Sequence, residues 1–156
     1  MAAARDGVRI DFGRIKEAFS RLSARHDFMI VEGAGGLMVP LAGGLMVADL
    51  IAALNLPLLV ISRPGLGTVN HTVLTCYAAK QLGLRVNGVI INNYPDAPDS
   101  AEESAPHLID SLSGAPLLGV FPHITSGDSR ETVELLAAKL AADPSTRIML
   151  REIGAL

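Results

Sequence analysis

The sequence has little of what a secreted, membrane-spanning or nucleic-acid-binding protein needs. Cys76 is the only cysteine in 156 residues, which excludes an internal disulfide framework and a thiolate metal cluster. No apolar run approaches the roughly 18 residues of a membrane span, and the first eleven residues lack the apolar core of a signal peptide. The net charge is −3, without the basic stripe typical of nucleic-acid-binding proteins. We therefore expect a cytoplasmic protein with no membrane and no nucleic-acid partner.

Apolar residues, by contrast, are abundant for a soluble chain. They make up 49% of the sequence against 19% charged residues, and the mean hydropathy is +0.38. Strands that are buried on both faces, as in a parallel sheet covered by helices, account for such a composition. A subunit interface could bury the rest. The length predicts one domain, residues 1–156, with a core of its own.

Helical and strand patterns alternate along the chain. Apolar residues at helical spacing after Asp11, an N-cap candidate, predict the first helix. We expect helices at 12–25, 47–54, 68–82, 101–112 and 131–142, and strands at 28–31, 56–62, 86–91 and 116–120; residues 147–156 receive no assignment. This alternation predicts an α/β fold with a parallel sheet flanked by helices.

In such sheets ligands bind beyond the carboxyl ends of the strands. The expected strands end in polar or turn-forming residues: Glu32 to Gly36, Ser62 to Gly65, Asn92–Asn93, and Phe121 to His123. The sequence therefore predicts that one rim of the sheet carries the site.

The first of these ends combines a carboxylate with glycines, and the word GGLMV occurs there and again eight residues later. A lone Glu32 at a strand end can hold Mg²⁺, which takes one or two carboxylates and completes its shell with water and phosphate. Glycines remove Cβ atoms, so that backbone N–H groups can approach an anion. A tight turn with a solvated Glu32 explains the same letters, and the pattern alone leaves both interpretations open.

Four segments together resemble the dethiobiotin synthetase family. They are VEGAGGLMVPL at 31–41, SRPGLGTVNHT at 62–72, GVIINN at 88–93 and LGVFP at 118–122, in the order of the family and over nearly the whole chain. The resemblance implies a P-loop NTPase-like three-layer sandwich. The G-x-x-x-x-G-K-[ST] loop that begins the family's fold is not in this sequence, so we expect the fold to lack its first strands.

The resemblance also implies an ATP-dependent cyclo-ligase of biotin biosynthesis. In that family diaminononanoate reacts with CO₂ to a carbamate, ATP phosphorylates the carbamate, and ring closure gives dethiobiotin. By position, Glu32 would bind Mg²⁺, and Gly33, Ala34, Gly35 and Gly36 would line the carbamate and amine through their backbone.

The second segment would bind the other end of the substrate. Gly67, Thr68, Val69 and Asn70 lie at an expected helix start, where free N–H groups and the helix dipole favour an anion. In the family this position receives the substrate carboxylate across a homodimer interface. The alternative is an ordinary first helical turn capped by Thr68.

The third and fourth segments would bind the nucleotide base. By the resemblance, Asn92 reads the adenine edge with an amide that both donates and accepts, and Pro122, His123 and Ile124 flank the base. The alternative is that Asn92 and Asn93 only begin a turn before Pro95.

Three functional hypotheses remain open at this stage. The chain could complete a synthetase together with a separate P-loop chain, it could be a non-catalytic dimeric binding module of that family, or it could be a related P-loop amidoligase such as a cobyrinate diamide synthase. Without a P-loop strand beside it, the expected strand 28–31 would present an unpaired edge. We expect a partner chain, a second copy or the 147–153 tail to cover that edge.

Overall fold

Three parallel strands form the central sheet of the computed structural model, which describes residues 2–126 and 128–156. They are β3 (Leu58–Ser62), β4 (Val86–Tyr94) and β5 (Leu117–Pro122), in the order β3-β4-β5. Each joins the next through a helix, as parallel pairing requires. β4 is the central strand, and its apolar run is buried from Gly88 to Ile91.

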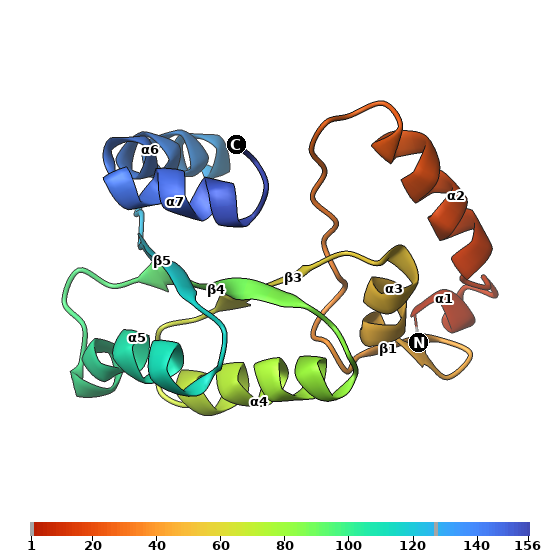
Figure 1. Cartoon of the computed structure of the whole chain (residues 1–156), viewed down its shortest axis with the longest axis horizontal. Helices are drawn as coiled ribbons and strands as arrows, with labels where there is room; N and C mark the ends of the chain where they lie inside the picture. Colours follow the sequence, from red (N-terminus) through yellow and green to blue (C-terminus); the bar gives the residue numbers. More distant parts are fainter. Residues whose placement is uncertain (1, 127) are drawn as a thin grey trace.

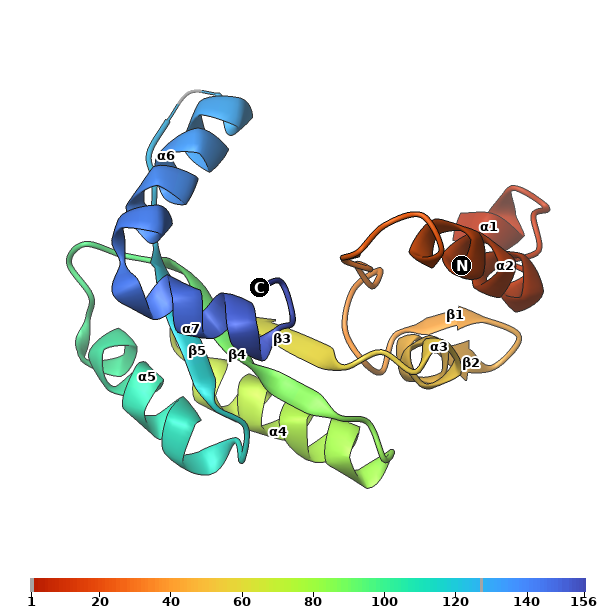
Figure 2. The same cartoon turned by 45° about the horizontal axis from the view of Figure 1, so that its top comes forward.

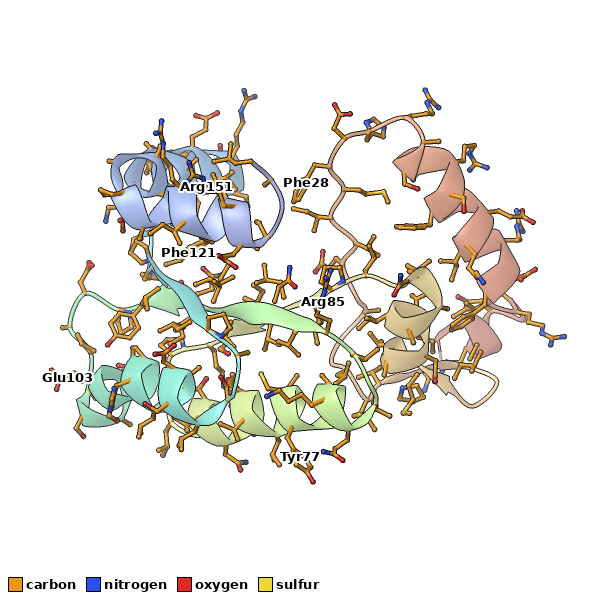
Figure 3. All side chains as sticks on the ribbon, in the orientation of Figure 1. Phe28, Tyr77, Arg85, Glu103, Phe121 and Arg151 are labelled. Carbon is orange, nitrogen blue, oxygen red and sulfur yellow. The ribbon has the colours of Figure 1, made fainter. Side chains whose placement is uncertain are left out.

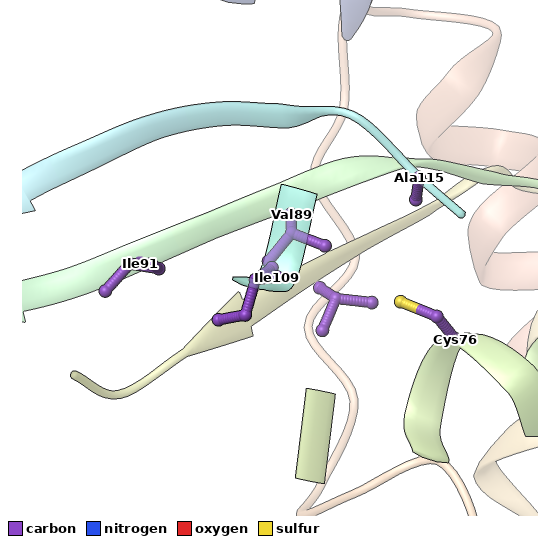
Figure 4. Close-up of a cluster of buried hydrophobic side chains, with 6 residues drawn as sticks. Cys76, Val89, Ile91, Ile109 and Ala115 are labelled. Atoms are coloured by element: carbon purple, nitrogen blue, oxygen red, sulfur yellow. The ribbon is translucent and has the colours of Figure 1, made fainter. Parts of the chain in front are cut away.

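Helices cover both faces of this sheet. α4 (Thr68–Gln81) and α5 (Ser100–Leu112) lie on one face, and α6 (Ser129–Ala142) and α7 (Pro144–Glu152) lie on the other (Figure 1). The predicted three-layer α/β arrangement is thereby confirmed. The larger core cluster fills the space between the sheet and the first helix pair (Figure 4); its buried members are Val60, Cys76, Val89, Ile91, Ile109 and Ala115.

The N-terminal elements stand to one side of the sheet in both views (Figures 1 and 2). They are α1 (Ala2–Arg5), α2 (Phe12–Ser23), a hairpin of β1 (Pro40–Ala42) and β2 (Leu45–Met46), and α3 (Val47–Leu54). α2 begins as predicted, because the Asp11 carboxylate accepts hydrogen bonds from two amides of its first turn. None of its side chains is buried.

The hairpin uses the second GGLMV word and was not predicted. Gly43 and Gly44 have φ angles of 59° and 83°, the left-handed pair that a two-residue hairpin turn requires. Both strands are very short, but the Gly-Gly pair between apolar residues was a usable signal.

The expected strand at 28–31 is wrong. These residues form no strand, and Phe28, Ile30 and Val31 are 42%, 79% and 43% exposed. An apolar run becomes a strand only when a neighbour accepts its backbone hydrogen bonds. No described strand pairs with the outer edge of β3, and residues 28–31 have no strand partner.

The C-terminal tail is helical and covers a face of the sheet, so the tail is not the element that covers the edge of the expected strand 28–31. α7 packs on β5, where Met149 is 7% exposed. The Asn87 side-chain amide also donates to the carbonyl of Glu152 at 3.1 Å. The other predicted helices and strands are confirmed within a few residues. In the part of the chain that the structure describes, no helix has the length and apolar character to cross a membrane.

Candidate functional site at the carboxyl ends of the strands

A turn connects β3 to α4, and a glycine stands immediately before the helix. The amide of Thr68 donates to the carbonyl of Gly65 at 3.1 Å, and Gly67 is the N-cap with φ +89°. A residue with a Cβ is strained at that angle, which explains the glycine. Thr68 is therefore the first helical residue and does not cap the helix, contrary to the alternative considered from the sequence.

A cleft of about 310 Å³ lies beside this helix start. β3 and one face of α4 line it, because positions four residues apart on a helix share a face. Its polar lining residues are Ser62, Arg63, Thr68, His71, Thr72 and Thr75. Hydroxyls and one guanidinium are donors for an anion, so the cleft suits a carboxylate or phosphate oxygen.

Two side-chain contacts connect β3 and its turn to α4. The hydroxyls of Ser62 and Thr72 are 2.6 Å apart and both residues are buried. Closer to solvent, a guanidinium nitrogen of Arg63 lies 3.4 Å from Nδ1 of His71. Thr68 is 3% exposed, and none of the hydrogen bonds among the described residues involves its hydroxyl. That hydroxyl is thus available at the wall of the cleft.

The ends of β4 and β5 meet at the same rim. Tyr94 pairs with Pro122, and the backbone amide of His123 donates to the carbonyl of Tyr94 at 2.7 Å. The His123 ring donates from Nδ1 to the side-chain oxygen of Asn93, because an amide oxygen can only accept. The structure therefore brings the third and fourth segments together.

β4 does not end at Asn92, as the sequence suggested, but continues to Tyr94. Asn93 has φ +66° inside it, a left-handed angle that Asn tolerates better than most residues. Asn92 and His123 are exposed, while Pro122 and Ile124 are half-buried. The simple turn before Pro95 is thus replaced by an extended strand end with a polar rim.

Glu32 lies in the irregular loop that replaces the expected strand. It is exposed, and no hydrogen bond or ion pair among the described residues includes its side chain. The following glycines are sterically constrained: a Cβ on Gly33 would lie 3.0 Å from Val47, and Gly35 has φ +88°. This loop packs on the start of α3, where the amide of Ala48 donates to the carbonyl of Leu37 at 3.0 Å.

The structure thus gathers three of the four segments at one rim and holds the first segment on α3. Within residues 2–126 and 128–156, no three His, Cys, Asp or Glu side chains are grouped so that they could hold a metal ion. Glu32 is a single carboxylate, and its role stays a prediction.

Comparison with known proteins decides the family. Residues 1–131 match the family model AAA_26, described as an AAA domain. The chain belongs to this family. Its curated relatives include the ATP-dependent dethiobiotin synthetase BioD of Bacillus subtilis (strain 168), with 41% identity over 128 residues, which are 82% of this chain and 55% of that protein.

Two further relatives carry the same name. The protein of Thermodesulfovibrio yellowstonii is 40% identical over 126 residues, covering 76% of this chain and 52% of the relative. The protein of Anaeromyxobacter dehalogenans (strain 2CP-1) is 49% identical over 110 residues, covering 67% and 49%. The resemblance to dethiobiotin synthetases is confirmed, and the chain spans about half the length of the curated relatives that it matches.

The sequence placed Ser62, Arg63 and Thr72 in the segment at this rim but gave none of them a role; in the structure Ser62 and Thr72 form the buried hydroxyl pair, and Arg63 lines the cleft. The signal was available, since Thr68, Thr72 and Thr75 follow helical spacing and therefore share one face. If this threonine face of α4 is assumed to pack beside the polar end of β3, the sequence predicts a cleft that is lined by hydroxyls.

Proposed function

We propose that this chain carries the substrate-binding and base-binding parts of a dethiobiotin synthetase, which carboxylates diaminononanoate and closes it to dethiobiotin with ATP and Mg²⁺. The observation that carries the proposal is the common rim. The start of α4, the Asn92–Asn93 strand end and residues 122–124 come from three distant segments and lie at the carboxyl ends of adjacent strands. The 41% identity to a named dethiobiotin synthetase supports the same assignment.

The carboxylate of the diamino acid would bind at the start of α4. The amides of Val69 and Asn70 have no intrahelical acceptor, and the helix dipole adds positive potential there. Thr68 offers an available hydroxyl, and Arg63 adds a cationic side chain to the same cleft. Gly67, Thr68, Val69 and Asn70 would thus hold the substrate tail, while the diamine extends away from the helix.

The residues present are compatible with the nucleotide base. Asn92 is exposed at the rim with an amide that donates and accepts. Beside it the strand ends hold Pro122, His123 and Ile124 together through the Tyr94–His123 backbone bond. A flat base would lie against these three residues, and Asn92 would contact its polar edge.

Glu32 is compatible with Mg²⁺ only as a single ligand. One carboxylate without a protein partner matches an ion that keeps several waters and takes further oxygens from phosphate. When bound, Mg²⁺ would supply neutralising charge to the phosphate oxygens. Gly33, Ala34, Gly35 and Gly36 would present backbone N–H groups to the carbamate, since none of these four amides donates in the backbone hydrogen bonds of the described residues.

A homodimer is part of the proposal. Large apolar side chains are exposed around α4, where Leu66, Leu74 and Tyr77 are 85%, 56% and 60% exposed. Tyr77 points away from the sheet on the outer side of the helix (Figure 3). A second copy that packs on this side would bury them beside the cleft and could complete the carboxylate site.

The phosphate-binding loop must come from residues outside this sequence, either in a continuous polypeptide or in a separate chain. The sequence contains no G-x-x-x-x-G-K-[ST] motif, and its three lysines do not follow a glycine loop. Positioning and neutralising the phosphoryl group is most of the catalysis in such reactions. The chain by itself should therefore bind the acid but not turn over.

The test is dethiobiotin formation from diaminononanoate, bicarbonate and Mg-ATP. We expect none with the chain alone and activity when a P-loop segment is supplied, either joined to this chain in one polypeptide or co-expressed with it. Product formation by the chain alone would contradict the need for a P-loop from elsewhere. No product and no acid binding under either condition would contradict the synthetase assignment.

A non-catalytic carboxylate-binding module is the second candidate. It is favoured by the fact that β3, α4 and the turn between them alone line the cleft, without Glu32. Calorimetry with diaminononanoate, with and without Mg-ATP, separates the two. Tight acid binding that ATP and a P-loop partner leave unchanged supports the module, and ATP binding that depends on the partner supports the synthetase.

A further inference from the structure

A pair of buried hydroxyls joins the last residue of β3 to the second turn of α4. Ser62 is 7% exposed and Thr72 is 3% exposed, and their oxygens are 2.6 Å apart. Away from water such a bond is stronger than at the surface, and losing one partner is costly. The pair is therefore a rigid connection between the sheet and the helix.

This connection sets the orientation of the helix start. Thr68 lies four residues before Thr72, so the two side chains share one face of α4. Thr68 is 3% exposed, takes part in no hydrogen bond through its hydroxyl among the described residues, and lines the cleft. Fixing Thr72 to β3 fixes the rotation of α4 that turns Thr68 and the first-turn amides toward the cleft.

The other side-chain hydrogen bonds near the start of α4 do not hold the helix in a fixed orientation on β3. Arg63 and His71 are exposed and 3.4 Å apart, at the long end of a hydrogen bond. Thr75 donates to the carbonyl of His71 at 2.8 Å, which is a bond within α4 and does not reach β3. Among the described residues, the Ser62–Thr72 pair is the only side-chain hydrogen bond between β3 and α4; Val60 and Cys76 add apolar packing between the two elements, which has no directional preference.

We propose that Ser62 and Thr72 are positioning residues for the carboxylate-binding start of α4. Their hydroxyls bond to each other at the wall of the cleft, and both residues act through the helix, by holding Thr68 and the amides of Val69 and Asn70 in place. The proposal rests on the proposed function, since its ligand is the carboxylate of the diamino acid. The competing interpretation is that the pair only satisfies two buried hydroxyls.

Four variants separate positioning from packing. Ser62→Ala/Thr72→Val removes both hydroxyls and leaves neither one unpaired, so its stability should stay near that of the wild type. Thr72→Ser keeps the hydroxyl and is the conservative rescue. Thr72→Val alone leaves the buried Ser62 hydroxyl without its partner, and its loss in the free energy of unfolding measures the effect of breaking the pair. Ser111→Ala is the matched control, because it removes a hydroxyl that bonds only within α5, to the carbonyl of His107 at 2.8 Å, and does not line the cleft.

The full chain is titrated with diaminononanoate and with its methyl ester by calorimetry, and amide exchange of Val69 and Asn70 is followed without ligand. We expect the double variant to keep its urea midpoint, to bind the acid about tenfold more weakly and to exchange both amides faster. Thr72→Ser and Ser111→Ala should stay within about twofold of the wild type. The ester should bind weakly to every variant.

A double variant that binds the acid as tightly as the wild type, with unchanged exchange, overturns the proposal. Failure of the wild-type chain to prefer the acid over the ester is a different result. It overturns the proposed function and removes the ligand on which this inference rests, and unchanged exchange in the double variant would then show that the pair only satisfies its own hydroxyls.

Discussion

The N-terminal half of this chain (residues 2–46) and the sheet half (residues 47–156) have similar apolar content in sequence but differ in what they bury. Around β4 the side chains of Val89 and Ile91 are fully buried. Of the described residues before Val47, only Leu37 is buried, and Ile30 is 79% exposed. The difference shows that apolar composition alone does not make a core: residues 28–31 have the letters of a strand but no neighbour to pair with.

The largest expected difference between the two halves comes from truncating one isoleucine in each. Ile109→Ala removes a fully buried side chain of α5, and we expect a loss of about 2–5 kcal/mol in the free energy of unfolding. Ile30→Ala removes the same atoms from an exposed position and should change it by less than about 0.5 kcal/mol. Urea denaturation of the two variants measures both values. Similar losses would show that the 28–31 segment is packed in solution, for example against a second copy.

A second test of the sheet half adds atoms to its packed interior instead of removing them. A Cβ on Gly88 would lie 2.5 Å from Leu118 and 2.9 Å from the carbonyl oxygen of Pro116, so Gly88→Ala should destabilise by about 1–3 kcal/mol. Gly65→Ala is the matched control, because nothing lies within 4 Å of its Cβ position. Thermal unfolding compares them, and an unchanged midpoint for Gly88→Ala would contradict the close β4–β5 packing.

The sequence predicted the elements whose signals are local. The helix after Asp11 and the alternation of strands and helices from Leu58 to Ala142 follow from caps and apolar periodicity. Gly67 as the cap of α4 was hidden, since Thr68 is the better capping residue by type and only the backbone angle decides between them.

The elements that depend on distant contacts could not be predicted. Whether residues 28–31 become a strand depends on a neighbour, which sequence periodicity does not contain. The Ser62–Thr72 pair depends on the register of α4 against β3, and the Asn93–His123 contact on the pairing of β4 with β5. The common rim was predictable because the carboxyl ends of parallel strands always meet at one edge.

Helix caps give a finer comparison of the two halves. The Asp99 carboxylate accepts from the amides of Ala101 and Glu102, both at 2.9 Å, at the start of α5. Because α5 packs on the core, Asp99→Ala should lower the free energy of unfolding by about 1 kcal/mol. Asp11→Ala removes an equivalent cap from α2, which buries nothing, so it should loosen only that helix.

Hydrogen exchange with mass spectrometry distinguishes these results. For Asp11→Ala we expect faster exchange confined to α2 and an unchanged global midpoint; for Asp99→Ala we expect a shifted midpoint. A global effect of Asp11→Ala would mean that the N-terminal half folds cooperatively with the sheet.

The smallest effect concerns the Cys76 thiol on α4. Burial raises the pKa of Cys76 above its ordinary value of 9.0, and the nearby Lys80 ammonium lowers it in part. The unfolded chain therefore loses this proton first as the pH rises. The stabilisation is fully present below about pH 9 and is lost as the pH rises through the folded pKa. The urea midpoint of the wild type should thus fall more between pH 8 and about pH 10 than that of Cys76→Ala.

Trypsin should cut near Arg21 and Arg25 before a thiol reagent labels Cys76, because the N-terminal half opens at a lower free energy than the sheet half. Labelling that precedes cleavage would reverse the order of stability that the burial pattern implies.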